Sequence, residues 1–223
     1  MQKMPTLPIH GVSRCPSINF FNVDCIEFMK SKPDKCYDLA IVDPPYGIDI
    51  AKWDTKEHKP TPEYFEQLFR VSKNQIVWGA NYFELPHNEA WICWDKTLSN
   101  GKTALGKNCK SEFELAWTSF ENKKAKLIRY TYDGNIQGFK GGRVDYKFKS
   151  IHPTQKPIDL YRWTLQNFAV EGMKIFDTHG GSMTIAKACE IEGFDLDICE
   201  IDKEYFQAGV NAFNLHKRQQ RLF

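Results

Sequence analysis

The sequence lacks the features that would place a chain in a membrane or tie it with disulfides. Its longest apolar runs fall far short of the roughly 20 residues that span a bilayer. The opening stretch MQKMPTLPIHGVSRC has no continuous apolar core of the signal-peptide kind. The 7 cysteines are odd in number and form no Cys-x-x-Cys pair, which disfavours a disulfide framework or a zinc site. We therefore expect a cytoplasmic protein with reduced cysteines, no metal and no membrane contact.

The chain also lacks a linker, an internal repeat and any low-complexity segment. No Gly/Ser-rich or Pro-rich stretch divides the 223 residues, and 42% of them are hydrophobic, as in ordinary globular proteins. We therefore expect a single domain over residues 1–223. Within it, an inserted recognition region is predicted at about residues 97–150, and the regular patterns described next fail from about residue 118 to residue 150.

Strand and helix patterns alternate along the chain. Leu39 to Val42 form the continuous apolar run typical of a buried parallel strand. Thr61 and Pro62 read as the N-cap and first residue of a helix over 61–75. Further strands are predicted at 76–83, 90–95, 111–120, 173–177 and 194–202, and helices from near Pro157 to Gly172 and up to Gly193. The strand, loop, helix and strand order after residue 172 is a parallel crossover unit, so the fold class is α/β with a mostly parallel sheet.

Positive charge gathers between residues 118 and 150. Eight lysines and arginines stand there against three acids, and six aromatic residues are interleaved with them. Such a stretch suits a polyanion that carries flat bases, although a solvated loop with a few core aromatics would look the same.

The stretch LAIVDPPYGIDI, residues 39–50, ends a buried strand on a carboxylate. Pro44 and Pro45 remove two backbone donors, so Asp43 and the nearby carbonyls form a pocket of acceptors. This pocket suits a ligand with an amino group, and Tyr46 offers a flat face for an aromatic ring. The alternative is a strand-terminating turn in which Asp43 accepts hydrogen bonds from its own loop.

A second candidate site is the stretch FDTHGGSMT, residues 176–184, together with Glu200. A glycine pair after a strand allows close approach of the backbone to a ligand, and an acid at the end of the next strand can hold two ribose hydroxyls. The same pattern also occurs in a simple turn. No GxxxxGK[ST] run is present, which favours a nucleoside ligand without a pyrophosphate.

Three motifs together resemble a known family. DPPYG at 43–47, HPTQKP at 152–157 and FDTHGGSMT at 176–184 are similar, in this order, to the signature motifs of the beta-type DNA amino-methyltransferases. NVDCIEFM at 22–29 and VWGANYFELP with WICWDK resemble stretches of the small, phage-like members. The resemblance covers nearly the whole chain. It implies a Rossmann-like fold with circularly permuted motif order, S-adenosyl-L-methionine as the cofactor, double-stranded DNA as the partner, and a bacterial or phage-infected cell.

The resemblance also implies roles for single residues. Asp43 and the Pro44 carbonyl would accept hydrogen bonds from the exocyclic amine, and Tyr46 would stack on a base swung out of the helix. In the cofactor site, Asp24 would contact the adenine ring and Glu200 the ribose, while Lys156 would pair with the methionine carboxylate. The implied catalytic residues are Asp43, Pro44, Pro45 and Tyr46, and the implied cofactor-binding residues are Asp24, Asp43, His152, Thr154, Lys156, Asp177, His179, Gly180, Gly181, Ser182 and Glu200.

The glycine loop departs from the family pattern. That pattern resembles DPFxGSGTT, whereas this chain has Thr178, His179 and Met183 where proline, phenylalanine and the second glycine are usual. Met183 puts in doubt how closely the backbone approaches the cofactor. His179 either contacts a ligand or packs as a ring, and packing is favoured.

The resemblance implies methyl transfer by direct displacement, without a covalent enzyme intermediate. The absence of any Pro-Cys pair agrees, because methylation of a cytosine ring carbon needs a cysteine nucleophile. Adenine N6 is the expected acceptor, and cytosine N4 is the alternative, since the family's cytosine enzymes more often carry serine where Asp43 stands. A catalytically silent DNA-binding subunit and an RNA or protein methyltransferase are further alternatives. The chain is expected to act as a monomer or homodimer.

Overall fold

The computed structural model describes residues 15–49, 51–97, 111–121, 123–132, 136–139, 145–146 and 154–220. Over these residues, no helix combines the length and the apolar character that crossing a membrane requires. The predicted basic residues Lys140, Arg143, Lys147 and Lys149 and the predicted site residue His152 lie outside the described residues.

The described residues contain ten strands in one sheet, in the spatial order β1-β10-β9-β2-β3-β5-β4-β6-β7-β8. The neighbours from β1 to β3 pair in parallel, and the strands beyond β3 pair in a mixed pattern. The α/β class is therefore confirmed. The strands are β1 (Ile18–Phe21), β2 (Tyr37–Val42), β3 (Ser72–Trp78), β4 (Trp91–Asp95), β5 (Phe113–Thr118), β6 (Lys126–Tyr132), β7 (Ile136–Phe139), β8 (Asp145–Tyr146), β9 (Lys174–Asp177) and β10 (Asp195–Cys199).

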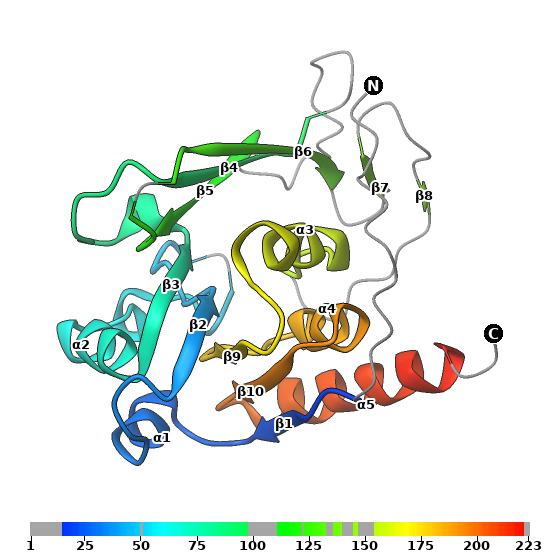
Figure 1. Ribbon diagram of the computed structural model, residues 1–223, viewed down its shortest axis with the longest axis horizontal. Coiled ribbons are helices and arrows are strands. Elements are labelled where there is room, and N and C mark those ends of the chain that lie inside the picture. Colours follow the sequence, from blue (N-terminus) through cyan, green and yellow to red (C-terminus); the bar gives the residue numbers. More distant parts are fainter. Residues whose placement is uncertain are drawn as a thin grey trace.

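Helices cover both faces of the parallel strands (Figure 1). On one face, α1 and α2 pack over a cluster that includes Met29, Tyr64 and Phe176. On the other face, α3, α4 and α5 enclose a second cluster that includes Leu165 and Ile198. The described helices are α1 (Cys25–Lys30), α2 (Pro62–Val71), α3 (Ile158–Phe168), α4 (Thr184–Glu192) and α5 (Lys203–Gln220), with short 3-10 turns η1 (Lys56–His58) and η2 (Ala80–Tyr82). Two covered faces explain the continuous apolar run in β2.

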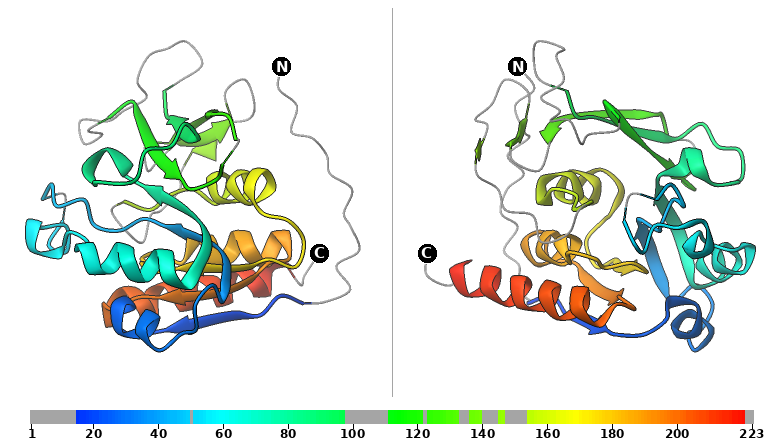
Figure 2. Two further views of the ribbon diagram at one scale, coloured as in Figure 1. Left: turned by 60° about the vertical axis from the view of Figure 1, so that its left-hand side comes forward. Right: turned by 180° about the vertical axis from the view of Figure 1, so that it is seen from behind.

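Beyond β3 the sheet bends over α3, as both views of Figure 2 show. Trp94 of β4 and Ile128 of β6 belong to the same buried cluster as Leu160 and Leu165 of α3. Strands β4, β5 and β6 therefore close the core above α3 and belong to the domain. The sequence between residues 118 and 150 has no periodic pattern, yet β6 runs parallel to β4 within it.

Two predicted boundaries near α2 are wrong. The helix begins as predicted, with the Thr61 side chain accepting a hydrogen bond from the Tyr64 amide. It ends at Val71, whereas the pattern predicted residue 75, because Ser72 to Gln75 pair with β2 and start β3 four residues early. The strand predicted over 76–83 stops at Trp78, since Gly79 adopts a left-handed φ of 68° and turns the chain into η2.

The predicted end of α3 is also wrong, whereas the end of α4 is confirmed. Helix α3 begins after Pro157, as expected, and stops at Phe168 instead of Gly172. Ala169 takes an extended conformation, and a turn with Gly172 at φ 86° then leads into β9. Helix α4 ends at Gly193, whose φ of 82° is the left-handed cap that glycine favours.

Candidate active site at the ends of β2 and β9

The candidate site lies where the sheet changes direction. Strands β9 and β2 are neighbours, but the chain leaves β9 toward β10 on one side and leaves β2 toward β3 on the other. Ligands of open α/β sheets bind at such a switch point, outside the carboxyl ends of the strands. Asp43 directly follows β2, and Asp177 is the last residue of β9. The two predicted motifs are therefore brought to one crevice.

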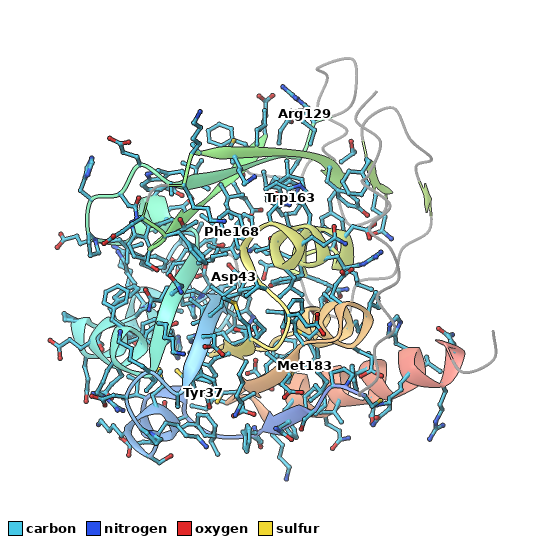
Figure 3. All side chains as sticks on the ribbon, in the orientation of Figure 1. Tyr37, Asp43, Arg129, Trp163, Phe168 and Met183 are labelled. Atoms are coloured by element: carbon cyan, nitrogen blue, oxygen red, sulfur yellow. The ribbon has the colours of Figure 1, made fainter. Side chains whose placement is uncertain are left out.

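Both carboxylate oxygens of Asp43 accept hydrogen bonds from side chains. The Tyr46 hydroxyl donates to Oδ1 at 2.5 Å, and the Lys156 ammonium donates to Oδ2, also at 2.5 Å. Lys156 Nζ lies 3.2 Å from Tyr46 Oη, so the three side chains form a closed cluster. Pro44 is buried directly after Asp43. Figure 3 shows Asp43 near the centre of the molecule in this view. Asp43 of the DPPY motif and Lys156 of the HPTQKP motif are therefore in direct contact.

The ring of Tyr46 rests on the backbone of Gly79. A Cβ atom built on Gly79 would lie 2.1 Å from Cε1 of Tyr46, so no side chain fits there. Tyr82, in the turn after Gly79, stacks on the Tyr46 ring with centroids 5.0 Å apart and planes at 13°. Tyr46 is therefore held as a rigid aromatic platform beside Asp43.

The loop after Tyr46 is anchored by a buried acid that the sequence patterns did not reveal. Asp54 Oδ1 accepts hydrogen bonds from the amides of Tyr46 at 2.6 Å and Gly47 at 2.9 Å, and Oδ2 accepts one from Ile48 at 3.4 Å. Only 1% of Asp54 is exposed. A carboxylate that satisfies three consecutive backbone donors fixes the path of the loop.

Glu114 is a second residue that the sequence patterns missed. Its Oε2 lies 3.3 Å from Lys156 Nζ, and its Oε1 lies 2.9 Å from Lys96 Nζ. Burial acts to raise the pKa of Glu114, but the charges of Lys156 and Lys96 hold it below its usual value. The alternating pattern of β5 could have predicted that Glu114 points inward, since it shares a strand face with the fully buried Ala116 and Thr118.

The glycine loop after β9 is tied to the end of β10. The Gly180 amide donates to the Cys199 carbonyl at 2.7 Å, and the Gly181 amide donates to Glu200 Oε2 at 2.7 Å. Glu200 Oε1 accepts from the Asp202 amide at 2.8 Å. Loop and acid are therefore adjacent, as the nucleoside-site prediction requires, and burial raises the pKa of Glu200.

The departures from the family pattern have local explanations. Met183 is fully buried at a φ of 54°, which only a few per cent of residues other than glycine adopt. Its side chain packs over Gly180 and Gly209, where an added Cβ would lie 2.6 Å and 2.3 Å from its atoms. It therefore points into the core. His179 bonds through Nδ1 to Thr178 Oγ1 at 2.8 Å, and burial lowers its pKa to about 4, so the ring is neutral at physiological pH.

Carboxylates dominate the electrostatics of the crevice. Burial raises the pKa of Asp177 to about 8, and the charges of Asp43 and Glu200 add to this in spite of a hydrogen bond from the His179 amide. The charge of Asp24 acts to raise the pKa of His179, against the larger effect of burial. Asp43 pairs with Lys156, and Asp177 is mostly protonated at neutral pH, so Glu200 and the more exposed Asp24 add the remaining negative charge around the glycine loop. Such a site favours a cationic ligand.

Asp24 and Thr154 occupy less distinctive surroundings. Asp24 is exposed after β1 and caps α1, with Oδ1 accepting from the amides of Ile26 at 2.8 Å and Glu27 at 3.0 Å. Thr154 and Ser182 lie in the loops that carry Lys156 and the glycine pair, and Ser182 Oγ lies 2.8 Å from Thr184 Oγ1. Over the described residues, His, Cys, Asp and Glu form no group of three placed to hold a metal ion.

A basic groove lies apart from the crevice, on the outside of β6 and α3. It has a volume of about 270 Å³, and Lys126, Arg129, Phe139 and Trp163 contribute to its lining. Arg129 is at the outer edge of the molecule in Figure 3. Lys126, Arg129 and Phe139 belong to the basic, aromatic stretch of the sequence, whereas Trp163 comes from α3, and the groove offers both kinds of contact that a nucleic acid uses.

Comparison with known proteins gives relatives at low sequence identity. No family model matches the chain. Among curated proteins, the chain is 25% identical to the type II methyltransferase M.HpaI of Haemophilus parainfluenzae over 86% of this chain and 74% of that protein.

Solved structures share the fold. The crystal structure of the M1.HpyAVI complex with S-adenosylmethionine matches with a TM-score of 0.59 at 20% identity, covering 87% of this chain and 99% of that one. The cytosine-N4-specific PvuII DNA methyltransferase matches with a TM-score of 0.55 at 16% identity, covering 90% and 89%. The predicted Rossmann-like methyltransferase fold is thus confirmed. The chain is thus similar in sequence to a type II methyltransferase and shares its fold with solved DNA methyltransferases.

Proposed function

We propose that the protein transfers a methyl group from S-adenosyl-L-methionine to the exocyclic N6 amine of adenine in double-stranded DNA. The observation that carries this proposal is the position of Asp43. It presents a carboxylate at the switch point between β2 and β9, beside the glycine loop and Glu200. The sequence relatives support the same reaction class.

The carboxylates of the crevice fit the proposed cofactor. S-adenosylmethionine carries a sulfonium and an ammonium group and supplies the methyl group when bound. Glu200 and Asp24 would attract such a cation, and the bound cation would favour ionisation of the Asp177 carboxyl, whose pKa is about 8. We infer that Glu200 holds the ribose hydroxyls and that Asp24 contacts the adenine ring. Thr154 and Lys156, with His152, would lie at the methionine end.

The residues of the DPPY motif would prepare the amine for attack. The lone pair of an exocyclic amine is delocalised into the base, which makes the nitrogen a poor nucleophile. Asp43 and the Pro44 carbonyl would draw the amine hydrogens toward themselves, and Tyr46 would hold the flipped base by stacking. The gain in rate then comes from positioning and from acceptor electrostatics, without a covalent enzyme intermediate.

The basic groove on β6 and α3 would contact the DNA. Lys126 and Arg129 offer charge to the phosphates, and Phe139 and Trp163 offer flat apolar surface. We place the recognition region at about residues 97–150, which includes β6, whereas α3 lies beyond it. DNA binding should weaken steeply with added salt, and a flat salt response would count against this surface.

We further propose that the protein acts in the cytoplasm of a bacterial or phage-infected cell as a monomer or homodimer.

Cytosine N4 is the second candidate acceptor, because the cytosine-N4-specific PvuII enzyme shares the fold. The test is incubation of unmethylated plasmid DNA with the protein and S-adenosylmethionine, followed by digestion and mass spectrometry of the nucleosides. N6-methyladenine is the expected product. N4-methylcytosine would establish the second candidate. DNA that is bound but left unmethylated would instead support a silent DNA-binding subunit.

A further inference from the structure

Lys156 contacts oxygens of three side chains from two separate parts of the chain, the DPPY motif and β5. Its ammonium lies 2.5 Å from Asp43, 3.2 Å from Tyr46 and 3.3 Å from Glu114. We propose that Glu114 is a positioning residue that draws Lys156 away from Asp43, so that Asp43 can accept a hydrogen of the substrate amine. This inference rests on the proposed methyl transfer and names a residue for it that none of the recognised motifs contains.

Both oxygens of Asp43 already accept hydrogen bonds, so Lys156 needs a second carboxylate nearby if it is to move away from Asp43. Oδ1 is bonded to Tyr46 and Oδ2 to Lys156, so an incoming amine must replace one of these donors. The Lys156 side chain is only 4% exposed. An ammonium buried to this degree cannot leave one carboxylate without another within reach, since an unpaired buried charge is strongly unfavourable. Glu114 Oε2, 3.3 Å from the ammonium, is such a partner within the protein itself and is in place before any cofactor carboxylate arrives.

The surroundings of Glu114 keep it charged and in place. Lys96, whose side chain is 8% exposed, binds the other oxygen of Glu114 and also donates to Ser111 Oγ at 3.2 Å. Burial acts to lower the pKa of Lys156, but the charges of Asp43 and Glu114 raise it above its usual value. The cluster therefore contains two ammonium and two carboxylate groups, and a shift of Lys156 from one carboxylate to the other leaves its total charge unchanged.

The pairing of β5 with β3 places Glu114 at the edge of the sheet where Asp43 lies. The parallel strands β2 and β3 end at the crevice, and β5 runs antiparallel to β3 with Trp78 opposite Ala116. The Gly79 amide donates to the Leu115 carbonyl at 2.9 Å. The first residues of β5 therefore lie where β3 ends, and Glu114 faces the same crevice as Asp43.

The test compares Glu114→Gln with a matched variant, Glu192→Gln. Glu192 is also a half-buried acid, paired with Arg162 at 2.7 Å, but it lies on α4 outside the cluster. Methyl transfer to duplex DNA should show a kcat roughly 10- to 100-fold lower for Glu114→Gln, since a misplacement of about 1 Å can cost roughly 100-fold in rate. The alkaline limb of its pH profile should move to lower pH, because Lys156 loses a carboxylate partner. Glu114→Asp should recover part of the rate. A Glu114→Gln profile equal to that of Glu192→Gln would overturn the proposal.

A double variant separates positioning from charge balance. Glu114→Gln leaves the cluster with one excess positive charge, and this could impair folding. Lys96→Met combined with Glu114→Gln removes the excess while Lys156 still lacks its second carboxylate. The double variant should keep the reduced kcat. Recovery of the wild-type kcat would show that Glu114 only balances Lys96, which contradicts the proposal.

A measurement without DNA separates this inference from the proposed function. Titration of the Lys156 Nζ resonance by NMR should give a lower pKa in Glu114→Gln than in the wild type and in Glu192→Gln. An unchanged pKa of Lys156 would overturn the inference even in an active enzyme. A wild type that leaves DNA unmethylated would instead refute the proposed function, while the titration would still report whether Glu114 holds Lys156.

Discussion

The Tyr46 hydroxyl donates a 2.5 Å hydrogen bond to Asp43, three residues earlier in the chain. The bond occupies one acceptor of Asp43 and fixes the Tyr46 ring against Gly79. The carboxylate oxygens of Asp43 that would accept a substrate amine are thus the same atoms that accept hydrogen bonds from Tyr46 and Lys156 in the free protein. A substrate amine would exchange with donors that the loop itself supplies.

Two substitutions of Tyr46 separate its hydroxyl from its ring. Tyr46→Phe keeps the stacking on Tyr82 and should leave kcat/KM within about threefold of the wild type, since the base needs only the ring face. Tyr46→Ala should lower kcat/KM by roughly 10- to 100-fold, because stacking on an aromatic side chain is worth about 1–3 kcal/mol per base. Steady-state methylation of duplex DNA measures both. Equal losses in the two variants would contradict a stacking role.

Gly79→Ala should disturb the site through the Tyr46 ring. The new methyl group would lie 2.1 Å from Cε1 of Tyr46 and would push the ring away from Asp43. The matched control is Gly172→Ala, because Gly172 also has a positive φ but has no atom within 4 Å of its added Cβ. Both variants should lose about 1 kcal/mol or more of unfolding free energy from backbone strain. Only Gly79→Ala should lose methyl transfer, and preserved activity would show that the ring can move freely.

Asp54→Ala should destabilise the DPPY loop. The substitution leaves the amides of Tyr46, Gly47 and Ile48 without their acceptor, which costs about 1–3 kcal/mol for buried donors. Asp49→Asn, in the same loop but exposed, is the control and should change stability little. Urea unfolding measures the difference. Equal midpoints for the two variants would mean that Asp54 does not anchor the loop.

Asp177 should make both stability and cofactor binding depend on pH. Its pKa rises from 3.8 to about 8 on folding. Between these values the folded protein holds a proton that the unfolded chain lacks, so the Asp177 contribution to stability falls as pH rises from about 4 to about 8. A bound cation favours the ionised form, so S-adenosylmethionine affinity should increase with pH up to about 8.

Calorimetric titration of the cofactor at several pH values tests the Asp177 prediction. Binding near pH 7 should release a proton from the wild type, and this release should be absent in Asp177→Asn. A wild-type affinity that stays constant between about pH 6 and about pH 8 would contradict the raised pKa.

The sequence predicts the part of the site that local patterns encode. The apolar run before Asp43 and the glycine pair before α4 both place candidate site residues at the ends of parallel strands, and the structure brings Asp43, Asp177 and Glu200 to one edge. Order along the chain was sufficient here because parallel strands always end on the same side of a sheet.

Long-range pairing explains what the sequence did not predict. Glu114 reaches Lys156 only because β5 runs antiparallel to β3, and Asp54 becomes an anchor only when its loop folds back on Tyr46. Residues Ser72 to Gln75 extended the helix pattern of α2, but pairing with β2 placed them in a strand. In each case a tertiary contact decided between local alternatives.

Methyl transfer by Asp43→Ala tests the central claim most directly. The wild type and the variant are incubated with duplex DNA and tritiated S-adenosylmethionine, after circular dichroism has shown that both are folded. The wild type should incorporate label into DNA, and the variant should lose at least about 100-fold of this activity, because the acceptor that activates the amine is gone. Equal incorporation by the two proteins would contradict the assignment of Asp43 and of the crevice between β2 and β9.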